Sequence, residues 1–188
     1  MLALVDFNNV NPSVKSESEI RDTLELVGYL IRKTLPVNPK ALSSDACEVE
    51  CRLYDGWVDK TGRYMEKYRL VQRSVSYLAG LESGVRIIPT VVTSLACMPS
   101  AQLVGTYKNS AQKMVDQMLA QDAHHYAHGA YHDGICLIAN DDDYVPVALA
   151  TAVRGSMPIR WLRKRTLAEN DSHLLGVNVQ LLNVIEWA

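Results

Sequence analysis

Short runs of apolar residues, each long enough for one buried β-strand, constrain the fold of this chain more than any other feature. Residues 2–5 (LALV) are apolar throughout and end at Asp6, and residues 134–139 (GICLIA) end just before Asn140 and Asp141. Strands without a polar face are typical of parallel sheets, which are covered by helices on both sides. An α/β fold is therefore expected.

Helical patterns alternate with these runs. Helices are expected over residues 16–34, 61–80, 112–127 and 144–154. Further strands are expected at 48–57, 85–92, 157–162 (MPIRWL) and 178–185 (NVQLLNVI), with a short helical piece between the last two and a possible short strand at 101–108. Pro89 favours an edge or a bulge for its strand. The alternation predicts a Rossmann-like, three-layer α/β/α fold with a mostly parallel central sheet.

Composition limits the number of domains and the kind of partner. With 188 residues, of which 48% are apolar, the chain is expected to form a single domain over 1–188. The net charge of −2 means that nucleic-acid binding would need a local basic patch. The four cysteines form no CxxC pair and are expected to be reduced thiols. No signal-peptide pattern or membrane span is present in the sequence, which predicts a soluble, cytoplasmic protein without a membrane partner.

Several aspartates are expected to meet at one edge of the sheet. Asp6 and the group Asp141, Asp142 and Asp143 follow two buried strands, and the carboxyl ends of parallel strands lie together. The helix over 112–127 begins at the same edge, which brings Lys113 and Asp116 there. Asp122, six residues further on, is expected to point toward the apolar face of that helix.

Four of these acids form a candidate metal site. Oxygen ligands from Asp6, Asp116, Asp141 and Asp143 suit Mg²⁺ or Mn²⁺, and such sites hydrolyse phosphodiesters by metal-activated water. Taken singly, Asp143 could cap the helix that begins at Tyr144, and Asp6 could be an ordinary strand-end residue. Asp142 is expected to be a solvated charge in the first helical turn. The predicted convergence favours the metal site.

The ordered set of motifs LVDFNNV, RLYDGW, KMVD followed by Asp122, and IANDDDYVPV resembles the NYN domains, LabA-like branch, of the PIN-like nuclease superfamily. The resemblance extends along nearly the whole chain. It implies a metal-dependent ribonuclease with Asp6, Asp116, Asp141 and Asp143 as metal-binding acids, whose products carry 5′-phosphate and 3′-hydroxyl ends. Asn9 fills the Asp-x-x-Asn position of the family, and Lys113 the position of the lysine before the helical aspartate.

The chain departs from the family pattern at two positions near these acids. Ala139 stands where the family commonly has a small hydroxyl residue, and Phe7 stands near the position of a glycine. The four acids themselves are present, which favours an active enzyme.

Basic side chains that could guide RNA occur in two stretches. One contains Lys60, Arg63, Lys67, Arg69 and Arg73, and the other contains Arg160, Arg163, Lys164 and Arg165 around Trp161. A solvated helix face and a basic loop are the alternatives. Arg63 and Lys67, expected one helical turn apart at the sheet edge that carries the acids, are the preferred substrate-binding pair, together with Asn9 and Lys113.

Two other clusters are expected to have structural roles. His124, His125, His128 and His132 lie near the end of the helix away from the acids, where a partial positive charge is favoured. Tyr54 and Trp57 could stack on a base, but aromatic residues on a sheet strand more often belong to the core.

The sequence thus predicts an endoribonuclease dependent on Mg²⁺ or Mn²⁺. A catalytically inactive module that binds RNA or a protein, with a homodimer left open, is the non-enzymatic alternative. A glycosyltransferase with a DxD motif at Asp141–Asp143 leaves Asp6 and Asp116 without roles, and a Toprim site would require a glutamate in place of Asp6.

Overall fold

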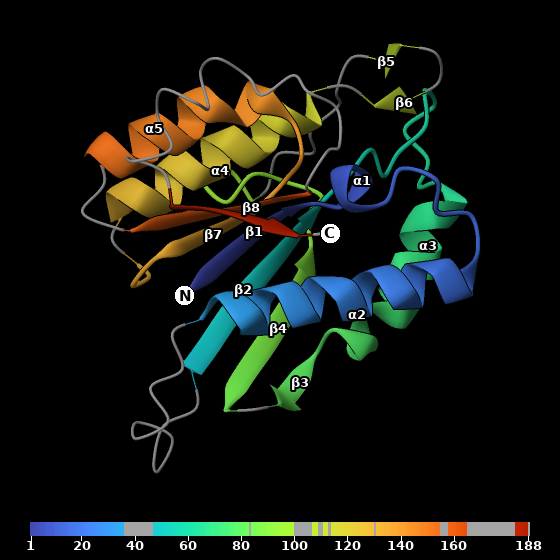
Figure 1. Ribbon diagram of the computed structural model, residues 1–188. Helices are drawn as coiled ribbons and strands as arrows, with labels where there is room; N and C mark the ends of the chain where they lie inside the picture. Colours follow the sequence, from blue (N-terminus) through green and yellow to red (C-terminus); the bar gives the residue numbers. More distant parts are fainter. Residues whose placement is uncertain are drawn as a thin grey trace.

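A seven-stranded sheet runs through the computed structural model, and six of its strands are parallel to one another (Figure 1). The structure describes residues 1–35, 47–82, 84–99, 107–108, 111–112, 114–129, 131–154, 158–164 and 183–187. The strands of this sheet are β1 (Leu2–Asp6), β2 (Cys47–Tyr54), β3 (Gly80–Glu82), β4 (Val85–Val91), β7 (Ile135–Ile138), β8 (Ile159–Lys164) and β9 (Asn183–Trp187). Their order is β3-β4-β2-β1-β7-β8-β9, and β3 is antiparallel to β4. The strands β5 (Tyr107–Lys108) and β6 (Ala111–Gln112) form a separate antiparallel pair.

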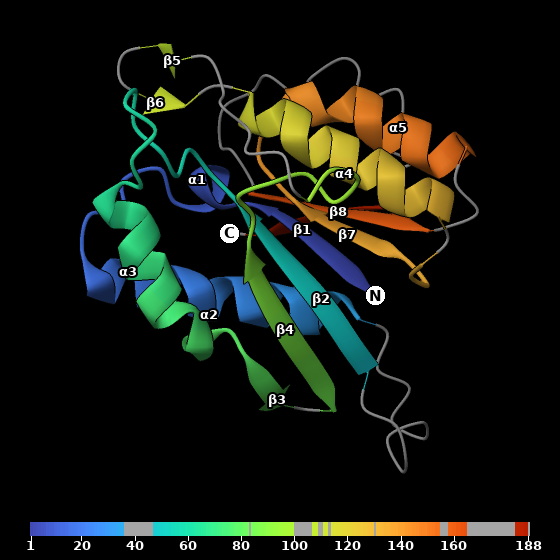
Figure 2. The ribbon, with the colours of Figure 1, turned by 180° about the vertical axis from the view of Figure 1, so that it is seen from behind.

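Helices cover both faces of the sheet. They are α1 (Phe7–Val10), α2 (Glu17–Thr34), α3 (Glu66–Ser74), α4 (Val115–Gly129) and α5 (Val145–Arg154), with short 3₁₀ helices η2 (Val75–Tyr77) and η3 (Asp142–Tyr144). In Figure 2, α2 and α3 lie on one side of the sheet, and α4 and α5 lie on the other. The expected three-layer α/β/α fold with a mostly parallel sheet is confirmed.

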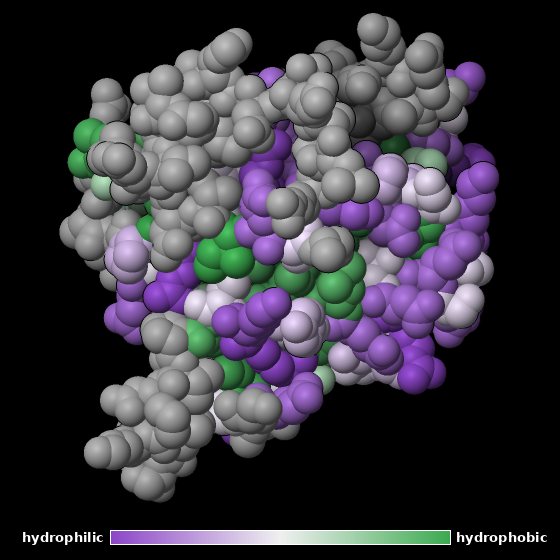
Figure 3. Space-filling view, in the orientation of Figure 1, coloured by the Kyte–Doolittle hydropathy of each residue, from purple (hydrophilic) through white to green (hydrophobic). Residues whose placement is uncertain are grey.

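Each face of the sheet carries its own hydrophobic core. Alternate residues of β1 separate the two cores, because Ala3 and Val5 pack with α2 and α3, whereas Leu2 and Leu4 pack with α4 and α5. The all-apolar run LALV is thus buried on both sides. The outer surfaces of α2 and α3 carry mainly hydrophilic side chains (Figure 3).

The predicted boundaries of α2 are nearly those observed. Ser16 caps the helix by accepting a bond from the backbone N–H of Glu19 at 3.3 Å, while the Glu19 carboxylate accepts from the backbone of Ser16 at 3.1 Å. This reciprocal arrangement satisfies two N–H groups that the helix itself leaves without partners.

Among the described residues no helix has the length and apolar character needed to cross a membrane.

The helix predicted over 61–80 is wrong at both ends, since α3 spans only Glu66–Ser74 and Gly80 belongs to β3. Residues 58–64 form a small hairpin in which Val58 pairs with Tyr64. The Asp59 carboxylate holds the turn by accepting from the Thr61 and Arg63 backbone N–H groups, and α3 begins only at Glu66. An aspartate that bonds to the backbone two residues on competes with helix formation.

Pro89 lies on β4, which pairs with β2 over its whole length. The short strand β3 covers only Val85 to Ile87 on the opposite side of β4, so Pro89 stands beyond the last residue paired with β3. The missing N–H is therefore tolerated at a local edge, as expected for a proline in a sheet.

The order in which successive strands are added to the sheet reverses at β1. From β1 it proceeds through β2 and β4 on one side, and β7, β8 and β9 then follow on the other side. In the register, Val5 pairs with Leu53 of β2 and with Ile138 of β7, so the residues after all three strands emerge together. Such a switch point is where open α/β sheets bind ligands, beyond the carboxyl ends of their strands.

Several expected features lie outside the described residues. They are Lys113, Arg165, the possible strand over 101–106, the helical piece between β8 and β9, and the first part of the strand expected at 178–185.

Candidate active site

Asp6 is the last residue of β1 and is almost completely buried, with 2% of its surface exposed. Its carboxylate caps α1 by accepting from the Asn9 backbone N–H at 3.0 Å. The Asn9 amide Nδ2 donates to the other oxygen of Asp6 at 2.7 Å, and Asn9 Oδ1 accepts from the Asn140 backbone N–H at 2.9 Å. Asn9 therefore ties the end of β1 to the residues that follow β7.

The hydroxyl of Tyr144 stands between two carboxylates. It lies 2.7 Å from Asp6 Oδ2 and 3.1 Å from Asp116 Oδ1. Tyr144 is buried at the end of η3, and Asp116 stands in the first turn of α4. A phenol has one proton, so it can donate to only one of these oxygens at a time. Asp6 and Asp116 are thereby gathered around one hydroxyl, as the predicted convergence requires.

This environment disfavours ionisation of Asp6. Burial raises its pKa from 3.8 to about 6, and the bonds donated by Tyr144 and by the Asn9 backbone oppose that rise. The neighbouring charges of Asp116 and Asp55 contribute to the rise to about 6. A carboxylate with a raised pKa beside other acids is typical of functional sites.

The three consecutive aspartates after β7 face different surroundings. Asp141 is the N-cap of η3, accepts from the Asp143 backbone N–H at 3.0 Å, and lines the same cavity as Asp6 and Asp116. Asp142 is 41% exposed and lies 3.0 Å from a guanidinium nitrogen of Arg163. Asp143 is exposed and does not contribute to the lining of this cavity.

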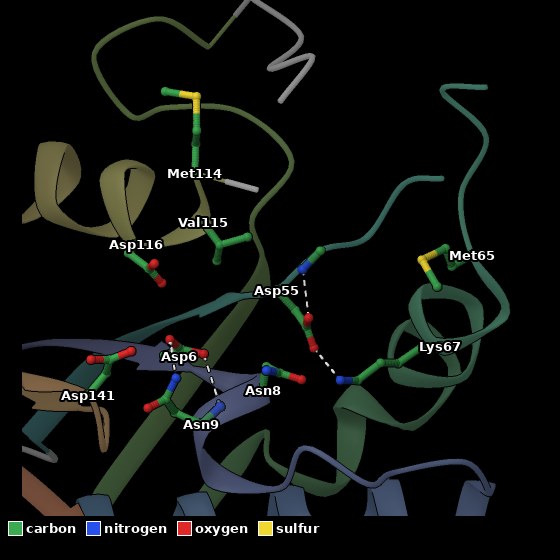
Figure 4. A pocket seen from close by; sticks show the side chains of 11 residues that line it. Asp6, Asn8, Asn9, Asp55, Met65, Lys67, Met114, Val115, Asp116 and Asp141 are labelled. Atoms are coloured by element: carbon green, nitrogen blue, oxygen red, sulfur yellow. Dashed lines mark hydrogen bonds and ion pairs between the residues drawn. The ribbon is translucent and has the colours of Figure 1, made fainter. Parts of the chain in front are cut away.

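The cavity at the switch point has a volume of about 360 Å³. In Figure 4 the carboxylates of Asp6, Asp116 and Asp141 face a common space at one end. At the other end Lys67 extends from α3 toward Asp55, with Nζ 2.5 Å from the carboxylate. The cavity thus combines an acidic end with a single lysine among its described lining residues.

Asp55 is a site residue that the sequence reasoning missed. It follows β2 directly, just as Asp6 ends β1, and only 8% of its surface is exposed. Its Oδ1 accepts from the Gly56 backbone N–H at 2.6 Å. The expected strand over 48–57 placed this aspartate inside the strand, whereas the strand ends at Tyr54. Its position after a buried strand was the available signal.

The expected pair of Arg63 and Lys67 does not share a helix. Arg63 lies in the hairpin before α3 and is exposed, whereas Lys67 reaches into the cavity. Arg69 and Arg73 pair with Glu66 at 3.5 and 3.4 Å on an exposed helix face. Arg69 and Arg73 therefore belong to a solvated helix face, which was the alternative to a role in guiding RNA.

The second basic stretch is a strand and not a loop, since Arg160, Arg163 and Lys164 belong to β8. Arg160 donates to the backbone oxygen of Thr34, and Arg163 is buried beside Asp142. Two of the cations expected to guide RNA are therefore used inside the fold.

Asp122 is fully buried on the apolar side of α4, as predicted, and takes no part in the cavity. It accepts from the Tyr54 hydroxyl at 2.6 Å, from Arg52 at 3.0 Å and from the Ala96 backbone N–H at 2.7 Å. Tyr54 and Trp57 are buried, which confirms their expected place in the core.

The histidines lie in and after the last turns of α4, away from the acids that surround its first turn. His132 is 3.5 Å from Glu50, and His125 packs against Tyr126 and Tyr131. His125 and His132 thus make contacts within the fold, as their expected structural role requires.

The donor set at the cavity fits a hard divalent cation. Asp6, Asp116 and Asp141 offer only oxygen ligands, which suit Mg²⁺ or Mn²⁺ better than zinc. A cation would also offset the cost of burying the Asp6 charge, which is the main cause of its raised pKa, and the smaller repulsion by Asp116 and Asp55. In the described part of the chain no three Asp, Glu, His or Cys side chains are gathered closely enough to hold a metal ion. Binding would therefore require these carboxylates to move closer together.

The fold and cavity define the chain as a three-layer α/β protein with an acidic cavity at its switch point. No protein-family model matches the chain, and no curated protein matches it. Among solved structures it is similar to a protein of unknown function from Vibrio parahaemolyticus, with a TM-score of 0.52 and 14% sequence identity. The similarity covers 100% of this chain and 91% of that one, and it supports the fold.

Proposed function

We propose that this protein is an endoribonuclease dependent on Mg²⁺ or Mn²⁺, of the NYN class that its motifs resemble. One observation carries the proposal. Asp6 from β1, Asp116 from α4 and Asp141 from the residues after β7 line one cavity, although they are far apart in the sequence. Acids that meet from three elements at the switch point of a parallel sheet are typical of a ligand site, which supports the proposal.

In this proposal Asp6, Asp116 and Asp141 hold the divalent cation. The bound cation supplies an activated water and stabilises charge on the phosphate during hydrolysis. Asn9 and Tyr144 hold the Asp6 carboxylate from two sides by hydrogen bonds of 2.7 Å.

Lys67 is the cation proposed to meet the phosphate of the substrate inside the cavity. Its ammonium is directed by Asp55 and lies across the cavity from the acids (Figure 4). Arg63, exposed on the hairpin before α3, is proposed to contact RNA outside the cavity. Lys113 keeps its proposed role next to substrate phosphate, and Asp143 remains a proposed metal ligand, although it is exposed and does not line the cavity with the other three acids.

Cleavage assays test the proposal. Wild-type protein with Mn²⁺ is expected to cut RNA, and Asp141→Asn is expected to lose at least about a hundredfold in rate because one ligand becomes neutral. Asp22→Asn, an exposed change on α2, is the matched control and is expected to cut at the wild-type rate. If Asp141→Asn cuts as fast as this control, the acids are not the catalytic site.

A non-catalytic RNA-binding module is the second candidate. The observation that favours it is the Tyr144 hydroxyl, which already provides a donor between Asp6 and Asp116. RNA binding by wild type and by Asp141→Asn, measured by fluorescence anisotropy, separates the two functions. Binding by both proteins without cleavage under Mg²⁺ or Mn²⁺ would refute the nuclease and support the module.

A further inference from the structure

A second cavity, of about 290 Å³, lies between α4, the strands β2 and β4, and the residues that follow β4. Its lining includes Arg52 from β2, Thr93 and Ser94 from the residues after β4, and His125 and Tyr126 from α4. In Figure 2 the chain that leaves β4 runs from the sheet toward α4. The described lining residues of the two cavities do not overlap. A cavity of this size admits a small molecule at a place separate from the acids.

A buried carboxylate fixes the walls of this second cavity. Asp122 is fully buried, and one of its oxygens accepts from the Ala96 backbone N–H at 2.7 Å. Its other oxygen accepts from Arg52 at 3.0 Å. The guanidinium of Arg52 also lies over the ring of Tyr126, 5.5 Å from its centre. One side chain of α4 thus links the residues after β4 to a cation on β2.

Arg52 has hydrogen-bond donors to spare. Its side chain is only 11% exposed, and three of its N–H groups donate to Tyr54 at 3.1 Å, Glu50 at 3.2 Å and Asp122 at 3.0 Å. A guanidinium carries five N–H groups, so two remain without an acceptor among the described residues. Because buried polar groups are usually satisfied, the cavity beside Arg52 is where the missing acceptor is expected.

The wall that follows β4 offers groups that can both donate and accept. The hydroxyls of Thr93 and Ser94 make no hydrogen bond to another described residue. Each can donate one hydrogen and accept others. Leu95 and Pro99 add apolar surface to the same wall. The cavity therefore suits a molecule with an apolar body and a polar end that accepts as well as donates.

The charges beside the cavity decide the charge of that polar end. The one positive charge of Arg52 faces two carboxylates, Asp122 and Glu50, so an added anion would be repelled. An ammonium has no lone pair for the spare N–H groups and would lie beside a like charge. An uncharged amide meets both requirements, because its oxygen accepts from Arg52 and its NH₂ group donates to the hydroxyls. We propose that this cavity binds a small molecule that carries an uncharged primary amide on an apolar body.

Three probes of similar shape and different charge test the site: benzamide, benzoate and benzylamine. Their binding is measured by NMR titration of isotope-labelled wild-type protein in EDTA and without RNA, so the result does not depend on the proposed nuclease. Benzamide is expected to bind with a Kd on the order of 1 mM and about tenfold more tightly than the two charged probes. The backbone signals of residues 92–99 are expected to shift.

Variants of the lining separate specific contacts from the general shape of the cavity. Ser94→Ala is expected to weaken benzamide binding about fivefold, since one hydrogen bond is lost. Ser13→Ala, an exposed change before α2, is the matched control and is expected to bind as wild type does. Arg52→Lys keeps the charge without the planar set of donors and is expected to weaken binding about tenfold. Thr93→Val removes a hydroxyl outside the Arg52 network, and it tests the site even if Arg52→Lys does not fold.

Equal binding of benzamide and benzoate would overturn the proposal, as would the absence of benzamide binding by wild type. Unchanged binding by both Ser94→Ala and Thr93→Val would also overturn it, because the hydroxyls would then not contact the amide. Signals that shift only around Asp6 would place the probe in the acidic cavity and refute the second site. Each of these outcomes leaves cleavage with Mn²⁺ to be judged by its own assay.

Discussion

Replacing Asp6 with asparagine is expected to stabilise the metal-free protein at neutral pH. Asp6 is 2% exposed, and burial raises its pKa from 3.8 to about 6. Between these values the folded state binds a proton that the unfolded state releases, so the free energy of unfolding falls as the pH rises through this window. A difference of roughly two pH units corresponds to a loss of about 3 kcal/mol, complete above about pH 6.

Asparagine is uncharged at every pH and removes this penalty. The substitution has a cost. The Asp6 carboxylate accepts through both oxygens, from the Asn9 backbone N–H at 3.0 Å and from Asn9 Nδ2 at 2.7 Å, whereas an asparagine amide accepts through one oxygen only. A lost hydrogen bond of this kind costs about 1 kcal/mol. The variant is therefore expected to be more stable than wild type by about 2 kcal/mol at pH 7.5 and less stable by about 0.5 kcal/mol at pH 4.

Urea unfolding in EDTA between pH 4 and 8 measures both effects, with Asp22→Asn as the exposed control on α2. Added Mn²⁺ is expected to stabilise wild type above pH 6 and to stabilise Asp6→Asn much less, because the variant lacks one anionic ligand. A stability difference between wild type and variant that does not change with pH would refute the reasoning, since burial would then not control the ionisation of Asp6.

Three further substitutions separate structural from functional residues. Asp122→Ala leaves the largely buried Arg52 guanidinium without its partner at 3.0 Å and is expected to cost about 3 kcal/mol in unfolding free energy, measured by urea denaturation; a cost below about 1 kcal/mol would contradict the structural role. Met114→Gly relieves a φ of 71° and is expected to be about 1 kcal/mol more stable than Met114→Ala, and equal melting curves would show that no strain is present. Asp143→Asn, an exposed change outside the cavity, is expected to lower the cleavage rate less than Asp141→Asn does, and the reverse order would move the proposed site.

The sequence predicted the parts of the site that depend on buried strands. The runs before Asp6 and Asp141 are apolar on both faces, which predicts two interior strands of a parallel sheet, and the structure shows that β1 and β7 are neighbours. Because parallel strands end at the same edge, the meeting of Asp6 with the residues after β7 follows once the two strands are neighbours. The orientation of Asp122 also followed, since helical periodicity fixes the direction of a side chain.

Local hydrogen bonding determined what could not be predicted. The turn held by the Asp59 carboxylate delays α3 to Glu66, and periodicity does not detect such a turn. Asp141 lines the cavity and Asp143, which lies within the 3₁₀ turn that follows, does not. The sequence alone does not distinguish these two aspartates. Asp55 was overlooked because its strand ends earlier than its aromatic residues suggest, and the Tyr144 hydroxyl gains its role only through tertiary contacts.

The position of a bound cation tests whether Asp6, Asp116 and Asp141 form a metal site. Crystals of the metal-free protein are soaked in Mn²⁺, and the anomalous scattering of manganese locates the ion without reference to any activity. We expect a peak between Asp6, Asp116 and Asp141, with oxygen atoms of at least two of them at about 2.2 Å. A cavity without a peak, or a peak only at the histidines around the end of α4, would contradict it.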